Sequence, residues 1–171
     1  YTMKKIIIAI DSFKGCLTSA EAGKAAEKGI KSINPFCHTS VIPIADGGEG
    51  LLDVLITATK GKYITLSAHG PLMKMAKTHY GLSGNGRTAI IEMAAISGLP
   101  LVPIEQRNPM LTTTFGTGEL IKDALNKGCR NFIIGIGGSA TNDAGLGMLQ
   151  ALGFRFLDKS GHTLGTGGQI M

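Results

Sequence analysis

Short apolar runs alternating with amphipathic stretches predict two βα units at the start of the chain. The β-branched run 4–10 is typical of a strand buried on both faces, and Thr18-Ser19-Ala20-Glu21 after it has capping-box spacing for a helix that ends near Ile33. The second unit pairs a strand at 38–44 with a helix at 51–59, closed by Lys60-Gly61. Strands linked through helices favour parallel pairing.

Beyond residue 61 the pattern changes to strands joined by turns. Gly70-Pro71 and Ser83-Gly84-Asn85-Gly86 separate apolar runs, so antiparallel pairing is expected there. The predicted elements of this α+β region are strands at 63–69, 76–82, 88–93, 131–136 and 154–157, and helices at 116–127 and 143–152. The change of pattern predicts a boundary between domains at 3–62 and 63–171, with Met3 as the natural start.

Composition narrows the class of protein. With 171 residues, 43% of them hydrophobic, the chain can bury a core. No apolar run approaches the about 18 residues that span a bilayer, and no secretion signal is visible, so a cytoplasmic protein with no membrane partner is expected. Two βα units cannot cover a parallel sheet, and the final stretch 165–171 is glycine-rich, which predicts an N-terminal portion of a longer chain.

Charge and cysteine content exclude further classes. The net charge of +5 comes from scattered residues, and aromatic residues make up 5% without any Trp, so nucleic-acid binding is not expected. Small anions remain suitable ligands for a modestly basic protein. The three cysteines have no C-x-x-C spacing, which argues against a disulfide framework or a zinc site.

Two polar loops follow the first two predicted strands. Asp11 and Lys14 in the first loop pair a carboxylate with a cation suited to phosphate oxygens, and Ser12 lies between them. In the second loop Asp46 and Glu49 flank Gly47-Gly48, where the backbone can approach an anion while the carboxylates hold Mg²⁺. Ligands bind at the carboxyl ends of parallel strands, although helix capping and turn formation also explain such residues.

A third candidate loop runs from a strand into a helix at 135–143. Gly137 and Gly138 supply backbone amides, and the loop adds the polar residues Ser139, Thr141, Asn142 and Asp143. The alternative is a dinucleotide fingerprint, because Gly135, Gly137 and Ala140 match G-x-G-x-x-A with Asp158 downstream. Asp143 as a simple N-cap is equally open.

A fourth candidate is the hydroxyl-rich stretch 112–119, which includes Thr114, Gly116 and Thr117 before a predicted helix. The chain has no Walker A motif and no G-x-S-x-G elbow, and its histidines lack metal-binding spacing. A P-loop NTPase is therefore excluded.

Four motifs in this order resemble the bacterial type 1 glycerate kinase family. They are Asp11-Ser12-Phe13-Lys14-Gly15, Ala45-Asp46-Gly47-Gly48-Glu49-Gly50, Ile91-Glu92-Met93-Ala94-Ala95 with Ser97-Gly98-Leu99, and Gly135 to Asp143. The resemblance covers nearly the whole chain from Met3, and family members are a little over twice as long. It implies an α/β fold, with a Rossmann-like parallel-sheet domain and a second, inserted α/β domain with a mixed sheet. Ala144 departs from the pattern, where Gly is frequent.

The resemblance also implies a reaction and its cofactors. ATP would phosphorylate D-glycerate, usually at the 2-hydroxyl, with Mg²⁺ bridging the phosphates. Lys14 would bind phosphate or the glycerate carboxylate, Asp46 and Glu49 the metal or hydroxyl, and which of Asp11, Asp46 and Asp143 is the base stays open. Ser12, Gly47, Gly48, Thr114, Gly116, Thr117, Gly137, Gly138, Ser139, Thr141 and Asn142 would line the substrate and nucleotide sites.

Two other functions remain alternatives. An NAD-dependent oxidoreductase would use the turn from Gly135 to Ala140, and a non-catalytic module would bind an acid or a nucleotide without turnover. A homodimer is compatible with each of these functions.

Overall fold

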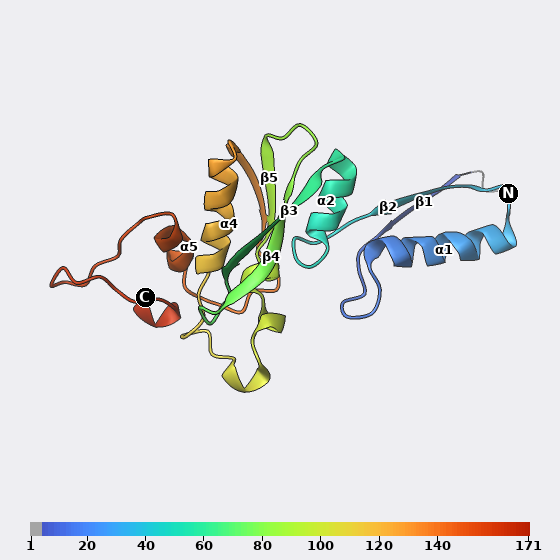
Figure 1. The fold of residues 1–171 in the computed structure, drawn as a ribbon. Helices are drawn as coiled ribbons and strands as arrows, with labels where there is room; N and C mark the ends of the chain where they lie inside the picture. The colour runs from blue at the N-terminus through green and yellow to red at the C-terminus, as the bar shows by residue number, and fades with distance from the viewer. Residues whose placement is uncertain (1–4) are drawn as a thin grey trace.

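The computed structural model describes residues 5–171, which form a two-stranded and a four-stranded sheet with helices packed on them (Figure 1). Strands β1 (Lys5–Ile10) and β2 (His38–Pro43) pair in parallel and are connected by helix α1 (Ser19–Ile33). The predicted first βαβ arrangement is therefore confirmed. Lys4, predicted as the first strand residue, and the predicted start at Met3 lie outside the described residues.

The start of α1 is fixed by the predicted capping box. The Thr18 hydroxyl accepts a hydrogen bond from the backbone N–H of Glu21 at 3.2 Å, and the Glu21 carboxylate accepts one from the backbone N–H of Thr18 at 2.9 Å. These bonds satisfy two backbone N–H groups that have no acceptor within the helix. The capping box therefore fixes where the first loop ends and α1 begins.

The two-stranded sheet departs from one prediction. Strand β1 is not buried on both faces, because its residues alternate between exposed and half-buried, and Ile7 is 59% exposed. Within residues 5–171, α1 covers one face of these strands and leaves the face of Ile7 and Ile42 open. A continuous apolar run does not by itself show whether one face or both faces of a strand are covered by other elements.

The four-stranded sheet has the order β3-β4-β5-β6 and mixes both pairing directions. Strands β3 (Lys62–His69), β4 (Met75–Leu82) and β5 (Thr88–Glu92) form the predicted antiparallel meander. Strand β6 (Asn131–Gly135) then adds in parallel to β5. It follows that β3, β5 and β6 run in the same direction, and their carboxyl ends lie at one edge of the sheet.

Helices pack on both faces of the central strand β5. Ile90 packs in one cluster with Leu52 and Ile56 of α2 (Leu51–Thr59), and Ile91 packs in another with Leu120 of α4 (Phe115–Asn126). Successive strand residues point to opposite faces, so this alternation separates α2 from α4 across the sheet. Helix α2 precedes the predicted boundary at residue 62 yet packs on β4 and β5, and the division into two domains stays a prediction.

The C-terminal part differs from the sequence prediction. Helix α5 covers only Leu146–Ala151, and residues 154–157 form no strand, although Leu157 makes an isolated bridge with Thr163. Shorter helices complete the chain: α3 (Ala94–Ser97), η1 (Leu99–Leu101), η2 (Ile104–Gln106) and η3 (Gly168–Ile170). The structure is thus of the predicted α/β class with parallel and mixed sheets. Among the helices of residues 5–171, none is long and apolar enough to cross a membrane.

Candidate functional site

The loops that follow β1 and β2 meet, as expected for neighbouring parallel strands. The Lys14 ammonium lies 3.4 Å from Oδ2 of Asp46, and both side chains are more than half exposed. Oδ1 of Asp46 accepts a hydrogen bond from the backbone N–H of Gly48 at 2.9 Å. Two residues that lie 32 positions apart therefore present a cation and an oriented carboxylate at one place.

The surroundings of Asp46 favour its charged form. The hydrogen bond from the Gly48 backbone and the positive charge of Lys14 both lower the pKa of the Asp46 carboxyl group. An ionised carboxylate with an exposed oxygen can bind a cation, but it is a weak acceptor for a proton.

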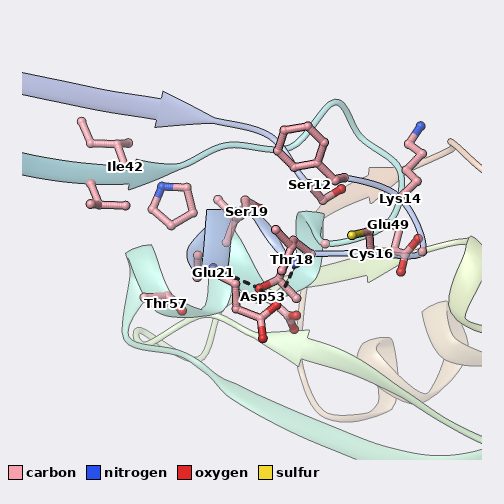
Figure 2. A pocket seen from close by; sticks show the side chains of 18 of the residues that line it. Ser12, Lys14, Cys16, Thr18, Ser19, Glu21, Ile42, Glu49, Asp53 and Thr57 are labelled. Carbon is pink, nitrogen blue, oxygen red and sulfur yellow. Dashed lines mark hydrogen bonds between the residues drawn. The ribbon is translucent and has the colours of Figure 1, made fainter. Parts of the chain in front are cut away.

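A cavity of about 570 Å³ opens beside this ion pair (Figure 2). Its wall is made by the first loop and the start of α1, by the end of β2, and by α2 with the residues just before it. Ser12, Lys14 and Glu49, all predicted as site residues, line the cavity together with Asp53. Its volume lies in the range of small-molecule sites.

The second and third glycine-rich loops lie back to back. The backbone N–H of Gly137 donates to the carbonyl of Gly47 at 3.0 Å. A Cβ atom added to Gly137 would lie 2.6 Å from Cα of Gly48, so the two backbones touch where neither residue has a side chain. The structure therefore joins Lys14, Asp46 and the turn after β6 into one continuous group of loops.

Glu92 anchors the second loop to the end of strand β5. It ends β5 and is only 9% exposed, and its Oε2 accepts hydrogen bonds from the backbone N–H groups of Gly50 at 3.2 Å and Leu52 at 3.3 Å. Burial raises the pKa of the Glu92 carboxyl group, and these two hydrogen bonds counteract the shift only in part. Glu92 thus caps α2, a role that the sequence analysis did not assign.

Replacing Glu92 by Gln should flatten the pH dependence of stability. Because the raised pKa favours the protonated acid in the folded state, stability should fall as pH rises from the ordinary Glu value through the folded-state value. Gln stays neutral and keeps an oxygen acceptor for the α2 amides. Urea unfolding at pH 4 to 8 measures the slope, and Glu105→Gln, at an exposed position, is the control. Equal slopes for Glu92→Gln and the unchanged protein would contradict the expectation.

Asp143 lies in a different environment, with 1% of its surface exposed. Its carboxylate accepts hydrogen bonds from the hydroxyls of Thr113 and Thr114 and from the backbone N–H groups of Thr114, Gly145 and Gly147, at 2.8 to 3.2 Å. These donors occupy its lone pairs. Asp143 thus connects the hydroxyl-rich stretch to the loop before α5, and within residues 5–171 no hydrogen bond or ion pair joins it to Lys14 or Asp46.

The predicted hydroxyl-bearing residues divide into two groups. Thr114 and Thr117 are buried, and their hydroxyls bond inside the protein, to Asp143 and Ser97 respectively. Gly116 is buried with them, and a Cβ atom added there would clash with the carbonyl oxygen of His69. This packing indicates a structural role for the stretch before α4.

The second group has hydroxyls without internal partners. Among the described residues, the side-chain oxygens of Ser12 and Thr141 are buried and have no hydrogen-bond partner, a condition shared only with the amide oxygen of Gln150. Buried hydroxyls are normally bonded, so these two are candidates for a ligand contact. Ser139 bonds to the backbone of Thr141 and shapes that loop, while Gly138 has φ 73° and Asn142 is exposed.

The dinucleotide alternative lacks its structural context. A pyrophosphate site needs a helix that begins directly at the glycine turn, whereas α5 begins at Leu146, well after Ala140. Asp158 is in an exposed turn, where its carboxylate accepts from the backbone of Ser160 and His162, rather than at the end of a strand. The stretch 135–143 does lead from β6 towards a helix, but that helix begins at Leu146 and not at Asp143 as predicted. Ala144 has φ 50°, a left-handed conformation that explains why Gly suits this position.

The fold and these loops define an α/β protein with glycine-rich and acidic loops at the carboxyl ends of its parallel strands. Such loops are typical of proteins that bind phosphate-bearing ligands. The model of the glycerate kinase family matches residues 6–171, and the chain belongs to this family.

Individual relatives agree with this assignment. The chain is 56% identical over 164 residues to the glycerate kinase of Bacillus subtilis (strain 168) and 51% identical over 164 residues to the glycerate 2-kinase of Escherichia coli (strain K12). Each alignment covers 96% of this chain and 43% of the relative, so the chain spans less than half of their length. A crystal structure of putative glycerate kinase 2 from Salmonella typhimurium LT2 superimposes with a TM-score of 0.83 at 48% identity, covering 98% of this chain and 45% of that one.

Proposed function

We propose that the polypeptide carrying this sequence transfers the γ-phosphoryl group of ATP to a hydroxyl of D-glycerate, with 2-phosphoglycerate as the product. The observation that carries the proposal is the junction at which Lys14 and Asp46 meet the paired glycine loops. Phosphoryl transfer needs positioning and charge neutralisation more than covalent help, and this junction offers a cation, free space for phosphate oxygens and a carboxylate. The names of the relatives supply the substrate.

The residues at the junction suit Mg²⁺ brought in by the nucleotide. Within residues 5–171 no cluster of three His, Cys, Asp or Glu side chains could hold a metal on its own. Mg²⁺ usually takes one or two protein carboxylates and completes its shell with phosphates and water. Asp46 and Glu49, both exposed in the second loop, would hold the ion, which neutralises phosphate charge when bound.

The other predicted site residues are proposed in two roles. Ser12, Gly47, Gly48, Gly137, Gly138, Ser139, Thr141 and Asn142 would contact substrate or nucleotide, supported by the partnerless hydroxyls of Ser12 and Thr141. Asp143, with Thr114, Gly116 and Thr117, would position that loop rather than react, because these residues are buried and bonded to one another or packed. Asp11 accepts a hydrogen bond from the backbone N–H of Ser12 at 2.6 Å and stays a candidate beside Lys14.

ADP release tests the proposal directly. The full polypeptide that carries this sequence should release ADP from Mg-ATP only when D-glycerate is present, with omission of glycerate as the control. No ADP with glycerate or related hydroxy acids would contradict a kinase function. A binding module would instead bind ATP or glycerate without turnover.

Lys14→Ala should weaken substrate binding with little effect on folding. The Lys14–Asp46 pair is exposed and contributes little to stability, whereas a charge-assisted bond to phosphate or carboxylate is worth about 1.5–3 kcal/mol, or about 10- to 150-fold in KM. Steady-state kinetics against both substrates measure the change. Lys28→Ala, at an exposed position of α1, is the matched control, and equal KM values for the two variants would argue against this role.

A further inference from the structure

The cavity beside Lys14 has a charged end and an apolar end (Figure 2). Lys14 and Glu49 lie at one end of it, and Ile42 and Thr57 lie at the other. Most of the wall surface is apolar, and the residues that supply it include Leu17, Val41, Pro43, Val54 and Ala58. A ligand that fills the cavity therefore combines a charged group with an apolar body.

Helix α2 lines the cavity with the side that does not pack on the four-stranded sheet. Leu52 and Ile56 pack in one cluster with β5. Val54 and Ala58 lie four positions apart and line the cavity on another side of the helix. The wall also includes Ile42, which is 48% exposed. Exposed apolar surface gathered around a cavity is typical of a ligand site.

Three polar residues mark successive positions along the wall. Glu49, Asp53 and Thr57 follow one another at intervals of four residues, and all three line the cavity. Asp53 and Thr57 are about one turn apart on α2, or about 6 Å along its axis, and Glu49 comes just before this helix. Asp53 therefore lies between the charged end and the apolar end.

Asp53 offers a fixed hydrogen-bond acceptor at this intermediate position. Its Oδ1 accepts a hydrogen bond from the hydroxyl of Tyr63 at 2.5 Å, which orients the carboxylate. Within residues 5–171 no hydrogen bond reaches its Oδ2. A carboxylate oxygen placed in this way suits the hydroxyls of a ribose.

Ser12 gives the charged end a donor without a partner. Its side-chain oxygen is buried, and no other group in the described part of the chain bonds to it. Ser12 also lines the cavity, and it belongs to the same loop as Lys14. A hydroxyl donor and an ammonium group in one loop suit the oxygens of a phosphate.

We infer that this cavity binds the adenosine part of ATP. The phosphates lie beside Lys14 and Ser12, and the ribose hydroxyls donate to Asp53. The adenine ring packs on Ile42 and on the Ala58 side of α2. This inference rests on the proposed function and assigns the cavity to the nucleotide and not to D-glycerate. D-glycerate has no apolar body, so most of the wall would be left without a partner, whereas a nucleoside covers it.

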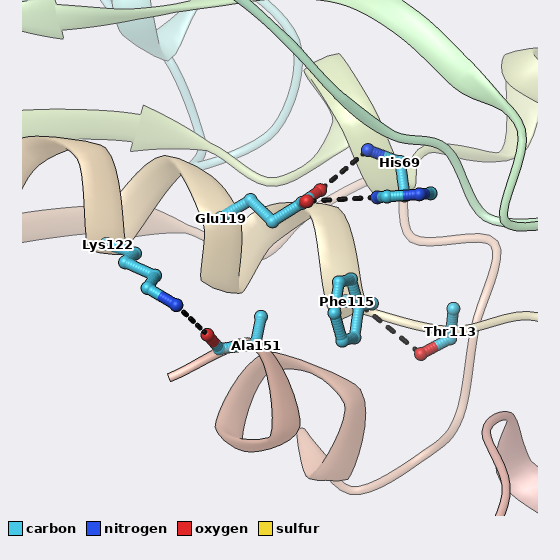
Figure 3. A network of polar contacts seen from close by, with 6 residues as sticks. All are labelled: His69, Thr113, Phe115, Glu119, Lys122 and Ala151. Carbon is cyan, nitrogen blue, oxygen red and sulfur yellow. Dashed lines mark hydrogen bonds and ion pairs between the residues drawn. The ribbon is translucent and has the colours of Figure 1, made fainter. Parts of the chain in front are cut away.

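Two other polar places on the molecule do not offer such a site. His69 and Glu119 bond to each other at 2.9 Å, and Phe115 packs edge-on against the imidazole (Figure 3). This network links α4 to the end of β3, and neither residue lines the cavity. A smaller cavity of about 220 Å³ lies at the turn between β4 and β5, where Leu82 is the one hydrophobic residue of the wall.

Thiol protection at Ala58→Cys tests the inference in the full polypeptide. Ala58 is exposed in the wall, and its replacement by Cys places a small reactive group where the adenine ring should pack. At an ATP concentration of about ten times Kd, alkylation of this thiol by iodoacetamide should slow about tenfold, because only unoccupied protein reacts. Peptide mass spectrometry measures the rate. Ala25→Cys, at an exposed position of α1 outside the wall, is the matched control and should react equally with and without ATP.

Inorganic tripolyphosphate and D-glycerate separate the parts of the ligand. Neither compound has a nucleoside, so neither should slow alkylation of Ala58→Cys. Slowing by either one to the extent seen with ATP overturns the inference. A thiol that is unreactive even without ATP also overturns it, because another part of the polypeptide then fills the cavity.

Ala58→Phe gives a kinetic readout of the same contact. A phenyl ring would occupy the space of the adenine ring, so the KM for ATP should rise by about 10- to 200-fold, while the KM for D-glycerate changes by less than about threefold. Ala25→Phe is the control. Glycerate-dependent ADP release without ATP protection of Ala58→Cys overturns this inference alone. Protection by ATP without any glycerate-dependent ADP overturns the proposed function and supports the nucleotide site.

Discussion

Replacing Asp143 by Ala should cost about 3–5 kcal/mol of unfolding free energy, a large share of the about 5–15 kcal/mol typical of a folded protein. The carboxylate is 1% exposed and accepts from two hydroxyls and three backbone amides. Truncation leaves these donors buried without a partner, and each such group costs about 1–3 kcal/mol before relaxation. Equilibrium urea unfolding measures the loss.

The control for Asp143→Ala is Asp158→Ala. Asp158 also accepts backbone hydrogen bonds, from Ser160 and His162, but it does so in an exposed turn where water can replace it. Its removal should have a much smaller effect. Equal losses for the two variants would show that the burial of Asp143 does not determine its contribution to stability.

Gly137→Ala should separate the two glycine loops and strongly reduce activity. The new Cβ would lie 2.6 Å from Cα and 3.0 Å from the backbone N of Gly48, and backbone atoms cannot move aside as a flexible side chain can. Overpacking of this kind costs about 1–3 kcal/mol, and an active-site displacement near 1 Å costs about 10²-fold in rate. Urea unfolding and ADP release measure the two effects separately.

The matched control is Gly29→Ala in α1. No atom lies within 4 Å of a Cβ built on Gly29, and an exposed helix position gains about 0.5–1 kcal/mol from this change. Activity should be unaffected. Wild-type kcat in Gly137→Ala would show that the contact between Gly137 and Gly48 is not needed for the reaction.

Local signals predicted most of the elements correctly. The capping box at Thr18 places the start of α1, and the Asn85-Gly86 turn places the hairpin between β4 and β5. Two predictions near the C-terminus were wrong: α5 is shorter than the pattern indicated, and 154–157 is not a strand. At those positions the hydrogen bonds of Asp143 and Asp158 to nearby backbone decide the conformation, and such competition is invisible to periodicity.

The candidate site shows the same division. Charged and glycine-rich residues after strands indicated that Lys14, Asp46 and the 135–143 loop mattered, and the expected parallel pairing of the first two strands agreed with the contact between Lys14 and Asp46. Nothing in the sequence indicated that the 135–143 loop contacts the loop of Asp46. Glu92 was missed as the cap of α2, since this role depends on partners 40 or more residues away. The strand order, which the sequence does not indicate, places the carboxyl ends of β3, β5 and β6 at the same end of the four-stranded sheet.

The sequence by itself determined the α/β class, the nearly complete set of helices and strands, and the loops rich in glycine and carboxylates, because these follow from local hydrogen bonding and hydrophobic periodicity. The tertiary structure alone decided which polar residues face a ligand and which are internal supports. Asp46 and Asp143 look alike in sequence, yet one is exposed beside Lys14 and the other is buried among five donors. Burial and long-range pairing set the chemistry of each carboxylate, and both arise only when distant segments pack together.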